Sequence, residues 1–164
     1  MARRRTDPAA GADALTAWAL DPDSAGRSVL APAVRYTLEL LAEESPGGAV
    51  EIRVPPYAAV QAIAGTRHTR GTPPAVVETD PQTWLSLACG EMHWHEALAE
   101  GRLGASGERS DLSDLLPLPG PRRLVRGLRA QAPTGTGNDG VGSDGMSTDG
   151  MSADGMSADG GEPR

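Results

Sequence analysis

The side chains of this chain best suited to chemistry are one cysteine and three histidines, because thiolates and imidazoles act as nucleophiles and bind metals. Cys89 is the single cysteine, and His93 and His95 follow shortly after it. A spacing of two places these histidines on different faces of a helix, and a fourth zinc ligand is not apparent beyond His68 or a nearby acid. We interpret Cys89 as a small packed thiol. An enzyme that uses Cys89, His93 and His95 as a thiol or metal centre remains an alternative.

Other catalytic patterns are weak in this sequence. Ser106 lies in Gly104-Ala105-Ser106-Gly107, which lacks the Gly-x-Ser-x-Gly pattern of a hydrolase elbow, and no histidine follows it in the chain. Phosphate-binding loops, dinucleotide fingerprints and paired-cysteine metal motifs are absent from the sequence as well. We therefore predict that the protein is not an enzyme and that it uses no cofactor and no metal.

Arg67, His68 and Arg70 form a second candidate group, in a polar connection rich in Thr and Gly. Guanidinium groups bind carboxylates and phosphates through forked hydrogen bonds, so these side chains could bind the acidic head group of a ligand. The alternative is a solvated loop in which one arginine pairs with Glu78 or another acid. The sequence leaves both interpretations open.

Helix start and stop signals surround these candidates. Asp7-Pro8 and Asp80-Pro81 each place a capping aspartate before a proline at the first helical position. Gly90 and Gly101 suit left-handed C-terminal caps. The sequence predicts one helix between Asp7-Pro8 and Asp21-Pro22 and a second from near Pro32 to Pro46-Gly47. Three more are predicted over 81–89, over 91–100 and around the leucines at 112, 115 and 116.

Strand signals lie between the predicted helices. Val50, Ile52 and Val54 alternate with charged residues, which is typical of a strand with one buried face. Three further strands are predicted over 57–64, 75–79 and 102–107. Alternating helices and strands over one sheet predict an α+β layer packing.

The apolar side chains that would face the interior are mostly aliphatic, since the sequence contains no phenylalanine. A packed core and the wall of a ligand cavity use the same residue types, so periodicity alone does not distinguish them. The interior set comprises Val54, Val60, Trp84, Leu85, Ala88, Met92, Trp94, Leu98, Leu103, Leu112, Leu115 and Leu116.

An ordered series of segments resembles a known family. The series consists of 50–56, 67–74, Asp80-Pro81-Gln82-Thr83-Trp84-Leu85, Gly90, 97–103 and 105–107. Over roughly residues 10–118 it resembles the bacterial sterol-carrier orthologue domain of the sterol carrier protein type 2 superfamily. The resemblance implies one mixed or antiparallel sheet of about five strands with helices packed over one face, and an apolar tunnel between the two layers.

The resemblance also implies a function. It predicts a non-enzymatic intracellular carrier that holds one sterol-like or fatty-acyl-like ligand, with the interior set lining the tunnel and Arg67, His68 and Arg70 near its head group. The alternative is a ligand-free interaction or accessory module with the same fold and a filled tunnel.

The two ends of the chain differ from its centre in composition. We expect a disordered basic N-terminus over 1–8, a sterol-carrier-like domain over 9–118, a short basic segment over 119–130 and a disordered tail over 131–164. The tail repeats Gly-Met-Ser-x-Asp every five residues, a period that builds no apolar face. A calcium-binding Gly/Asp repeat is the alternative, but its nine-residue period is missing.

Charge and hydropathy bound the partners. The net charge of −7 disfavours nucleic acid, which needs a basic face. Arg122, Arg126 and Arg129 share one side of a short predicted helix opposite Leu124, Val125 and Leu128, which indicates a transient contact with a membrane surface. No apolar run is long enough for a signal peptide core or a membrane span, and the single cysteine fits a reducing compartment. We expect a cytoplasmic protein.

Overall fold

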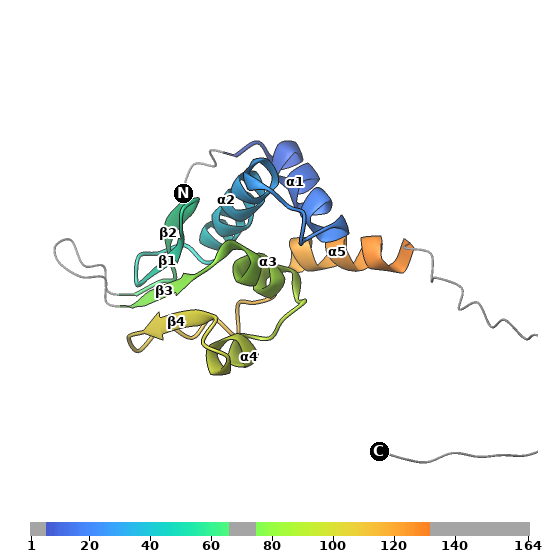
Figure 1. Cartoon of the computed structure of the whole chain (residues 1–164). Coiled ribbons are helices and arrows are strands. Elements are labelled where there is room, and N and C mark those ends of the chain that lie inside the picture. The colour runs from blue at the N-terminus through green and yellow to red at the C-terminus, as the bar shows by residue number, and fades with distance from the viewer. Residues whose placement is uncertain (1–5, 66–74, 132–164) are drawn as a thin grey trace, which may run out of the picture. The chain divides into compact units, whose positions relative to one another are not determined.

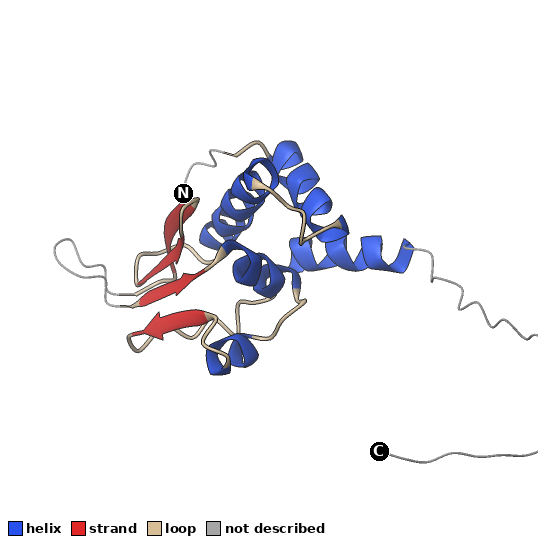
Figure 2. Cartoon of the chain, viewed as in Figure 1, coloured by secondary structure: helices blue, strands red, loops and turns tan. Residues whose placement is uncertain are grey.

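The computed structural model describes residues 6–65 and 75–131. Arg3 to Arg5, the connection with Arg67, His68 and Arg70, and the repeats of the tail lie outside these ranges. The described elements form one mixed sheet with helices over one face, as Figures 1 and 2 show, so the predicted α+β class is confirmed.

Two long helices come first. Helix α1 (Pro8–Leu20) begins where the sequence predicts, because the Asp7 carboxylate accepts the Ala10 N–H at 2.9 Å. Helix α2 (Arg27–Glu44) begins five residues before Pro32, which lies in its second turn and not at its start. The carbonyl that loses its donor to Pro32 is that of Ser28, an exposed residue that water can solvate.

The N-terminal boundary also differs from the expectation. Residues 6–8 were expected to be disordered, but Thr6 donates its N–H and its hydroxyl to the Glu39 carboxylate at 3.1 and 3.2 Å. Together with the Asp7 cap, these bonds fix the start of α1 on α2. The two helices approach closely at Gly11, where an added Cβ would lie 2.5 Å from Cγ of Tyr36.

The sheet contains four strands in the order β2-β1-β3-β4. These are β1 (Val50–Val54), β2 (Ala58–Ala62), β3 (Val76–Thr79) and β4 (Leu103–Ser106). Strand β1 is antiparallel to β2, and β3 is antiparallel to β4, whereas β1 and β3 pair in parallel. The four predicted strands are confirmed.

The expectation of about five strands is wrong for the described residues. After β4 the chain reverses at Gly107, with φ 93°, and Ser110 donates its N–H and its hydroxyl back to the Gly107 carbonyl. The chain then forms a turn instead of a further strand. The positive φ explains a glycine here, because other residues avoid this region.

The helix predicted from Leu112, Leu115 and Leu116 is a single turn in the structure. The N–H groups of Leu115 and Leu116 both donate to the Leu112 carbonyl, at 3.0 and 3.1 Å, and no helix continues from there. Pro117 follows directly and restricts the residue before it to extended backbone. The leucine spacing was compatible with a helix but too short to require one.

Helix α3 (Pro81–Cys89) packs against α2 next to the sheet, while α4 (Trp94–Ala99) contacts β4. The second predicted helix, 91–100, is therefore shorter than expected. Its first three residues form the turn that follows the left-handed Gly90. Both predicted glycine caps are confirmed, since Gly90 and Gly101 have φ 80° and 68°.

The last described helix is α5 (Pro119–Gln131), which packs against α1 and α3 through buried Pro121 and Val125. Figure 1 shows α1 and α5 on the far side of α2 and α3 from the sheet. The segment expected to be a separate basic stretch after the domain thus contributes to the same core as the preceding helices.

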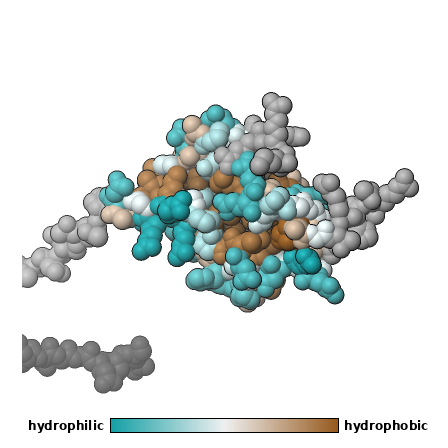
Figure 3. Space-filling view, turned by 180° about the vertical axis from the view of Figure 1, so that it is seen from behind, coloured by the Kyte–Doolittle hydropathy of each residue, from teal (hydrophilic) through white to brown (hydrophobic). Residues whose placement is uncertain are grey.

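The buried core is mostly aliphatic and contains three tryptophans, Trp18, Trp84 and Trp94, of which the first two have hydrogen-bonded indoles. The Trp84 indole donates to the Thr37 hydroxyl at 2.8 Å, and that of Trp18 donates to Gln82 at 2.6 Å. Figure 3 shows that apolar residues also reach the surface in patches bordered by hydrophilic ones. Among the described residues, Leu20 and Leu98 are the large apolar side chains with the greatest exposure.

Candidate functional site

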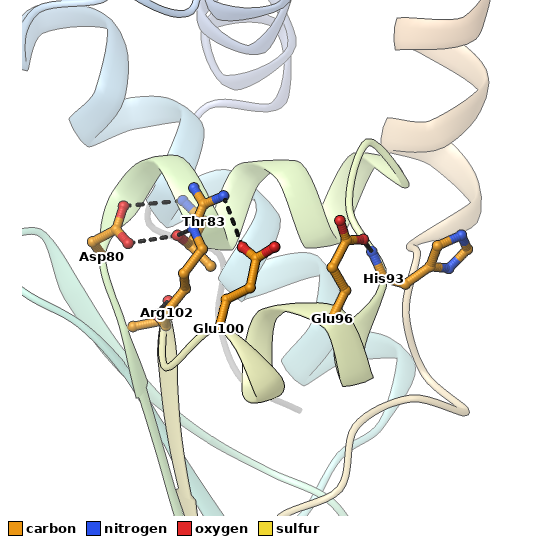
Figure 4. Close-up of polar contacts among 7 residues, drawn as sticks. Asp80, Thr83, His93, Glu96, Glu100 and Arg102 are labelled. Atoms are coloured by element: carbon orange, nitrogen blue, oxygen red, sulfur yellow. Dashed lines mark hydrogen bonds and ion pairs between the residues drawn. The ribbon is translucent and has the colours of Figure 1, made fainter.

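A polar cluster lies where α3 begins (Figure 4). The Asp80 carboxylate accepts the N–H groups of Gln82 and Thr83 at 2.9 and 3.0 Å and the Thr83 hydroxyl at 2.5 Å. Arg102 donates to the same hydroxyl at 3.2 Å. Partial burial would raise the pKa of the Asp80 carboxyl, but these hydrogen bonds and the Arg102 charge together lower it. The cluster caps α3 and connects it to β4, so it is structural.

A pocket of about 210 Å³ lies elsewhere, between the start of α4, the turn at 112–117 and the first turn of α5. Its apolar wall consists of Met92, Trp94, Leu116 and Pro117, with Gly90 at its edge. Its polar wall consists of His93, His95, Ser113 and Arg122. Apolar and polar side chains line this pocket in equal numbers, so it is suited to a small ligand with both an apolar and a polar part.

The pocket is held together by contacts between α3 and the turn. An added Cβ on Gly90 would lie 3.1 Å from Cγ of Pro117, so the left-handed cap of α3 also permits the turn to approach. The Leu118 N–H donates to the Ala88 carbonyl at 2.9 Å. Arg122, four residues after Leu118, lines the same pocket as His93 and His95.

Some charged side chains around the pocket have partners, whereas Arg122 has none among the described residues. His95 lies 3.9 Å from the Asp111 carboxylate, and Asp111 accepts the Ser113 N–H at 2.9 Å. Hydrogen bonds from Ser113 lower the pKa of the Asp111 carboxyl, so it is ionised at neutral pH. The Arg122 guanidinium has no hydrogen-bond or ion-pair partner within the ranges 6–65 and 75–131.

The predicted thiol or metal centre does not form in the described residues. Cys89 is buried at the end of α3 and does not line the pocket that holds His93 and His95. Burial, with a smaller effect of Glu91, raises the pKa of the Cys89 thiol to about 12, so almost no thiolate exists at neutral pH. Within the described part of the chain, no three His, Cys, Asp or Glu side chains gather to hold a metal ion.

The predicted interior set lies in three kinds of position. Val54, Trp84, Leu85, Ala88 and Leu112 are fully buried, and Trp94 and Leu103 are nearly so. Val60, Met92, Leu115 and Leu116 are half-buried against the core. Leu98 is 43% exposed, contrary to its expected position over the sheet. The short helix α4 turns Trp94 and Ala97 inward and ends two residues after Ala97.

Met92, Trp94 and Leu116 are the members of this set that meet in the pocket. Sequence reasoning missed the contributions of Gly90, Ser113 and Pro117. It treated Gly90 as a helix cap and Pro117 as a helix stop, and Ser113 fell within the helix predicted from the leucines. It assigned Arg122 to a membrane-facing helix. The only sequence signal for the pocket was the pair of prolines at 117 and 119, which indicates a sharp change of direction between the leucine turn and α5.

The comparison with known families defines the class of protein. The family model described as bacterial SCP ortholog matches residues 26–118, more than half of the chain. The chain therefore belongs to this bacterial family of sterol-carrier-protein orthologues, as the ordered sequence segments indicate. The match covers α2 through the leucine turn and includes most of the pocket wall, but not α1 or Arg122. No curated protein matches the chain significantly.

Proposed function

We propose that the protein is a non-catalytic carrier that holds one apolar ligand, of a fatty-acyl or sterol-like kind, between its helices and its sheet. Family membership over residues 26–118 is the observation that carries this proposal. The aliphatic inner face of the sheet under α2 and α3 supports it. The high pKa of the Cys89 thiol also favours a carrier over a thiol enzyme.

The pocket of about 210 Å³ would be the entrance to the ligand site. This volume is below the roughly 300–1,000 Å³ of ordinary ligand sites, so a long acyl chain requires the interior to open. Met92 and Leu116 are half-buried, line the pocket and pack against the core cluster. A methionine side chain adapts easily to new packing, so movement of Met92 is the least costly way to extend the space.

The energetics permit such an opening. Burial of one methylene contributes about 0.8 kcal/mol, so burial of a long acyl chain contributes on the order of 10 kcal/mol before association costs. Side-chain rearrangements in a core cost about 1–3 kcal/mol. The remaining amount, about 7–9 kcal/mol, must also offset the cost of association, so micromolar binding, which corresponds to about 8 kcal/mol net, requires burial of nearly the whole acyl chain.

A ligand-free interaction module is the second candidate. It is favoured by the complete burial of Val54, Trp84, Leu85 and Leu112 and by the small volume of the pocket. Fluorescence titration with a fluorescent fatty acid, followed by competition with unlabelled lipids, distinguishes the two candidates. Saturable binding displaced by one lipid class supports the carrier. Absence of saturable binding for every class supports the module.

A contact with anionic membranes is part of the carrier proposal. Arg122, Arg123 and Arg126 are exposed on α5, whereas Arg129 pairs with Glu91 at 3.2 Å. Because Val125 is buried and Leu124 and Leu128 pack against the core, the contact would be electrostatic and would not insert α5. Sedimentation with anionic and with neutral vesicles tests it; equal binding to both contradicts it.

No helix in the described ranges has the length and apolar character needed to cross a membrane. The cytoplasmic location stays a prediction from the lone cysteine and the sequence pattern. Fractionation of the native host, with detection of the chain by antibody, would test it.

A further inference from the structure

We propose that the pocket beside α4 is a carboxylate site, in which Arg122 binds the acidic end of a ligand. This inference rests on the proposed carrier function for its biological meaning and goes beyond it by naming the ligand's head group. It also places that group at Arg122 and not at Arg67, His68 or Arg70, which lie outside the described residues. Three properties of the pocket support this assignment.

The first property is an uncompensated charge. Arg122 lines the pocket, and no described residue offers it an acceptor. Three acids next to pocket-lining residues have partners: Glu91 pairs with Arg129, Glu96 accepts the His93 N–H at 3.4 Å, and Asp111 accepts from Ser113 and faces His95. A fourth acid, Asp114, is exposed and does not line the pocket. A guanidinium at the mouth of an apolar pocket attracts an anion more strongly than it would in open water.

The second property is an additional donor. The His93 imidazole points away from Glu96, as Figure 4 shows, and lines the same pocket as Arg122. Ser113 and His95 line it too, but both already face the Asp111 carboxylate. The His93 imidazole donates a hydrogen bond to a carboxylate oxygen in a suitable tautomer. Arg122 itself presents the planar fork that matches a carboxylate.

The third property is the size and polarity of the remaining wall. Met92, Trp94, Leu116 and Pro117 provide apolar surface next to the donors. A volume of about 210 Å³ equals the space of about seven water molecules at roughly 30 Å³ each. This accommodates a carboxylate with a short apolar chain. An inorganic anion leaves the apolar wall uncovered, and a cation is repelled by Arg122.

Pentanoate is the probe that fits these properties without opening the core. We expect saturable shifts of the amide resonances of Met92 to His95 and Ser113 when pentanoate is added to the full chain. Pentanol has the same apolar chain without the charge, so it should cause no saturable shifts there. Equal responses to pentanoate and pentanol would overturn the proposal, as would no saturable response to pentanoate.

Three variants identify the charge responsible. Arg122→Gln should weaken pentanoate binding about 10- to 100-fold, the effect of losing one charge-assisted hydrogen-bonded pair. Arg122→Lys keeps the charge without the fork and should lose less. Arg123→Gln is the matched control, because Arg123 is equally exposed on α5 but does not line the pocket. Equal affinities for Arg122→Gln and Arg123→Gln would refute the role of Arg122.

The same proteins separate this inference from the carrier function. If pentanoate binds through Arg122 but hexadecanoate does not bind, the carboxylate site is correct and the carrier proposal fails. If hexadecanoate binds with the same affinity to the wild type and to Arg122→Gln, the carrier proposal holds and the head-group assignment is wrong. Melting curves of the variants establish that each is folded.

Discussion

The thiol of Cys89 offers a direct test of the non-enzymatic interpretation. Burial raises its pKa from an ordinary value of 9.0 to about 12. At about pH 8 an ordinary thiol is roughly one-tenth thiolate, whereas this thiol is on the order of one ten-thousandth thiolate. Reaction with a disulfide reagent requires thiolate, so the native protein should react about a thousandfold more slowly than the unfolded chain.

A second route leads to the same expectation. Cys89 is 3% exposed, so a bulky reagent reaches it chiefly when the protein opens. A domain with a stability of about 5 kcal/mol or more is open less than about one part in a thousand of the time. The raised pKa and the low exposure of Cys89 therefore both predict slow modification of its thiol.

The assay measures thiol modification by a coloured disulfide reagent in the native chain and in guanidinium chloride. The matched control is Cys89→Ala with Leu98→Cys, which carries its thiol at a position that is 43% exposed in the parent chain. We expect the control to react at nearly the unfolded rate, and the native rate of Cys89 to rise with pH without a plateau below about pH 9. A modification rate that reaches a plateau near neutral pH, or fast modification of the native protein, would refute the raised pKa and favour the thiol-enzyme alternative.

Three further predictions concern stability and are measured by chemical denaturation. Asp80→Ala should lower the free energy of unfolding by about 1–2 kcal/mol at neutral pH by removing the α3 cap, whereas Asp80→Asn should lose less; equal losses would contradict the cap. The pKa of the Asp80 carboxyl is lowered in the folded state, so its ionic contribution to stability is present above the ordinary pKa of 3.8 and is lost as the pH falls through the lower folded pKa. The difference in the free energy of unfolding between wild type and Asp80→Asn should therefore narrow in acid. Gly127→Ala should stabilise the protein by about 0.5–1 kcal/mol, since the added Cβ meets open space. Gly11→Ala should destabilise it by about 1–2 kcal/mol, because the added Cβ clashes with Tyr36. A change of the same sign for both variants would contradict the close approach of α1 and α2.

The parts of the fold that sequence predicted well depend on local chemistry. Asp7 and Asp80 cap α1 and α3 through their own side chains, and Gly90 and Gly101 end helices with their own backbone angles. The alternation in 50–54 needs only a sheet with one buried face. These signals act within a few residues, so the surrounding fold does not change their meaning.

The errors arose where tertiary packing decides. Leu112, Leu115 and Leu116 have the spacing of a helix, but the chain turns after one hydrogen-bonded turn and uses Leu112 as a core residue. Leu98 has the spacing of an inward residue but lies at the end of a six-residue helix. The amphipathic pattern of α5 was correct, yet the apolar side faces α1 and α3 instead of a membrane.

The pocket could not be predicted because its walls come from three separate segments. Met92 and Trp94 belong to the set of predicted wall residues, but their meeting with Pro117 and Arg122 depends on the bend after α3 and on the contact of Gly90 with Pro117. A sequence pattern gives the face of each helix, but not which faces meet.

Native mass spectrometry of the full chain after incubation with hexadecanoate tests the carrier proposal most directly. We predict a complex of one chain with one hexadecanoate, which survives gentle desolvation and in which an excess of a fatty acid of different mass replaces the hexadecanoate. If only the mass of the free chain is found with hexadecanoate and with a panel of sterols, the carrier proposal is contradicted and the ligand-free module remains.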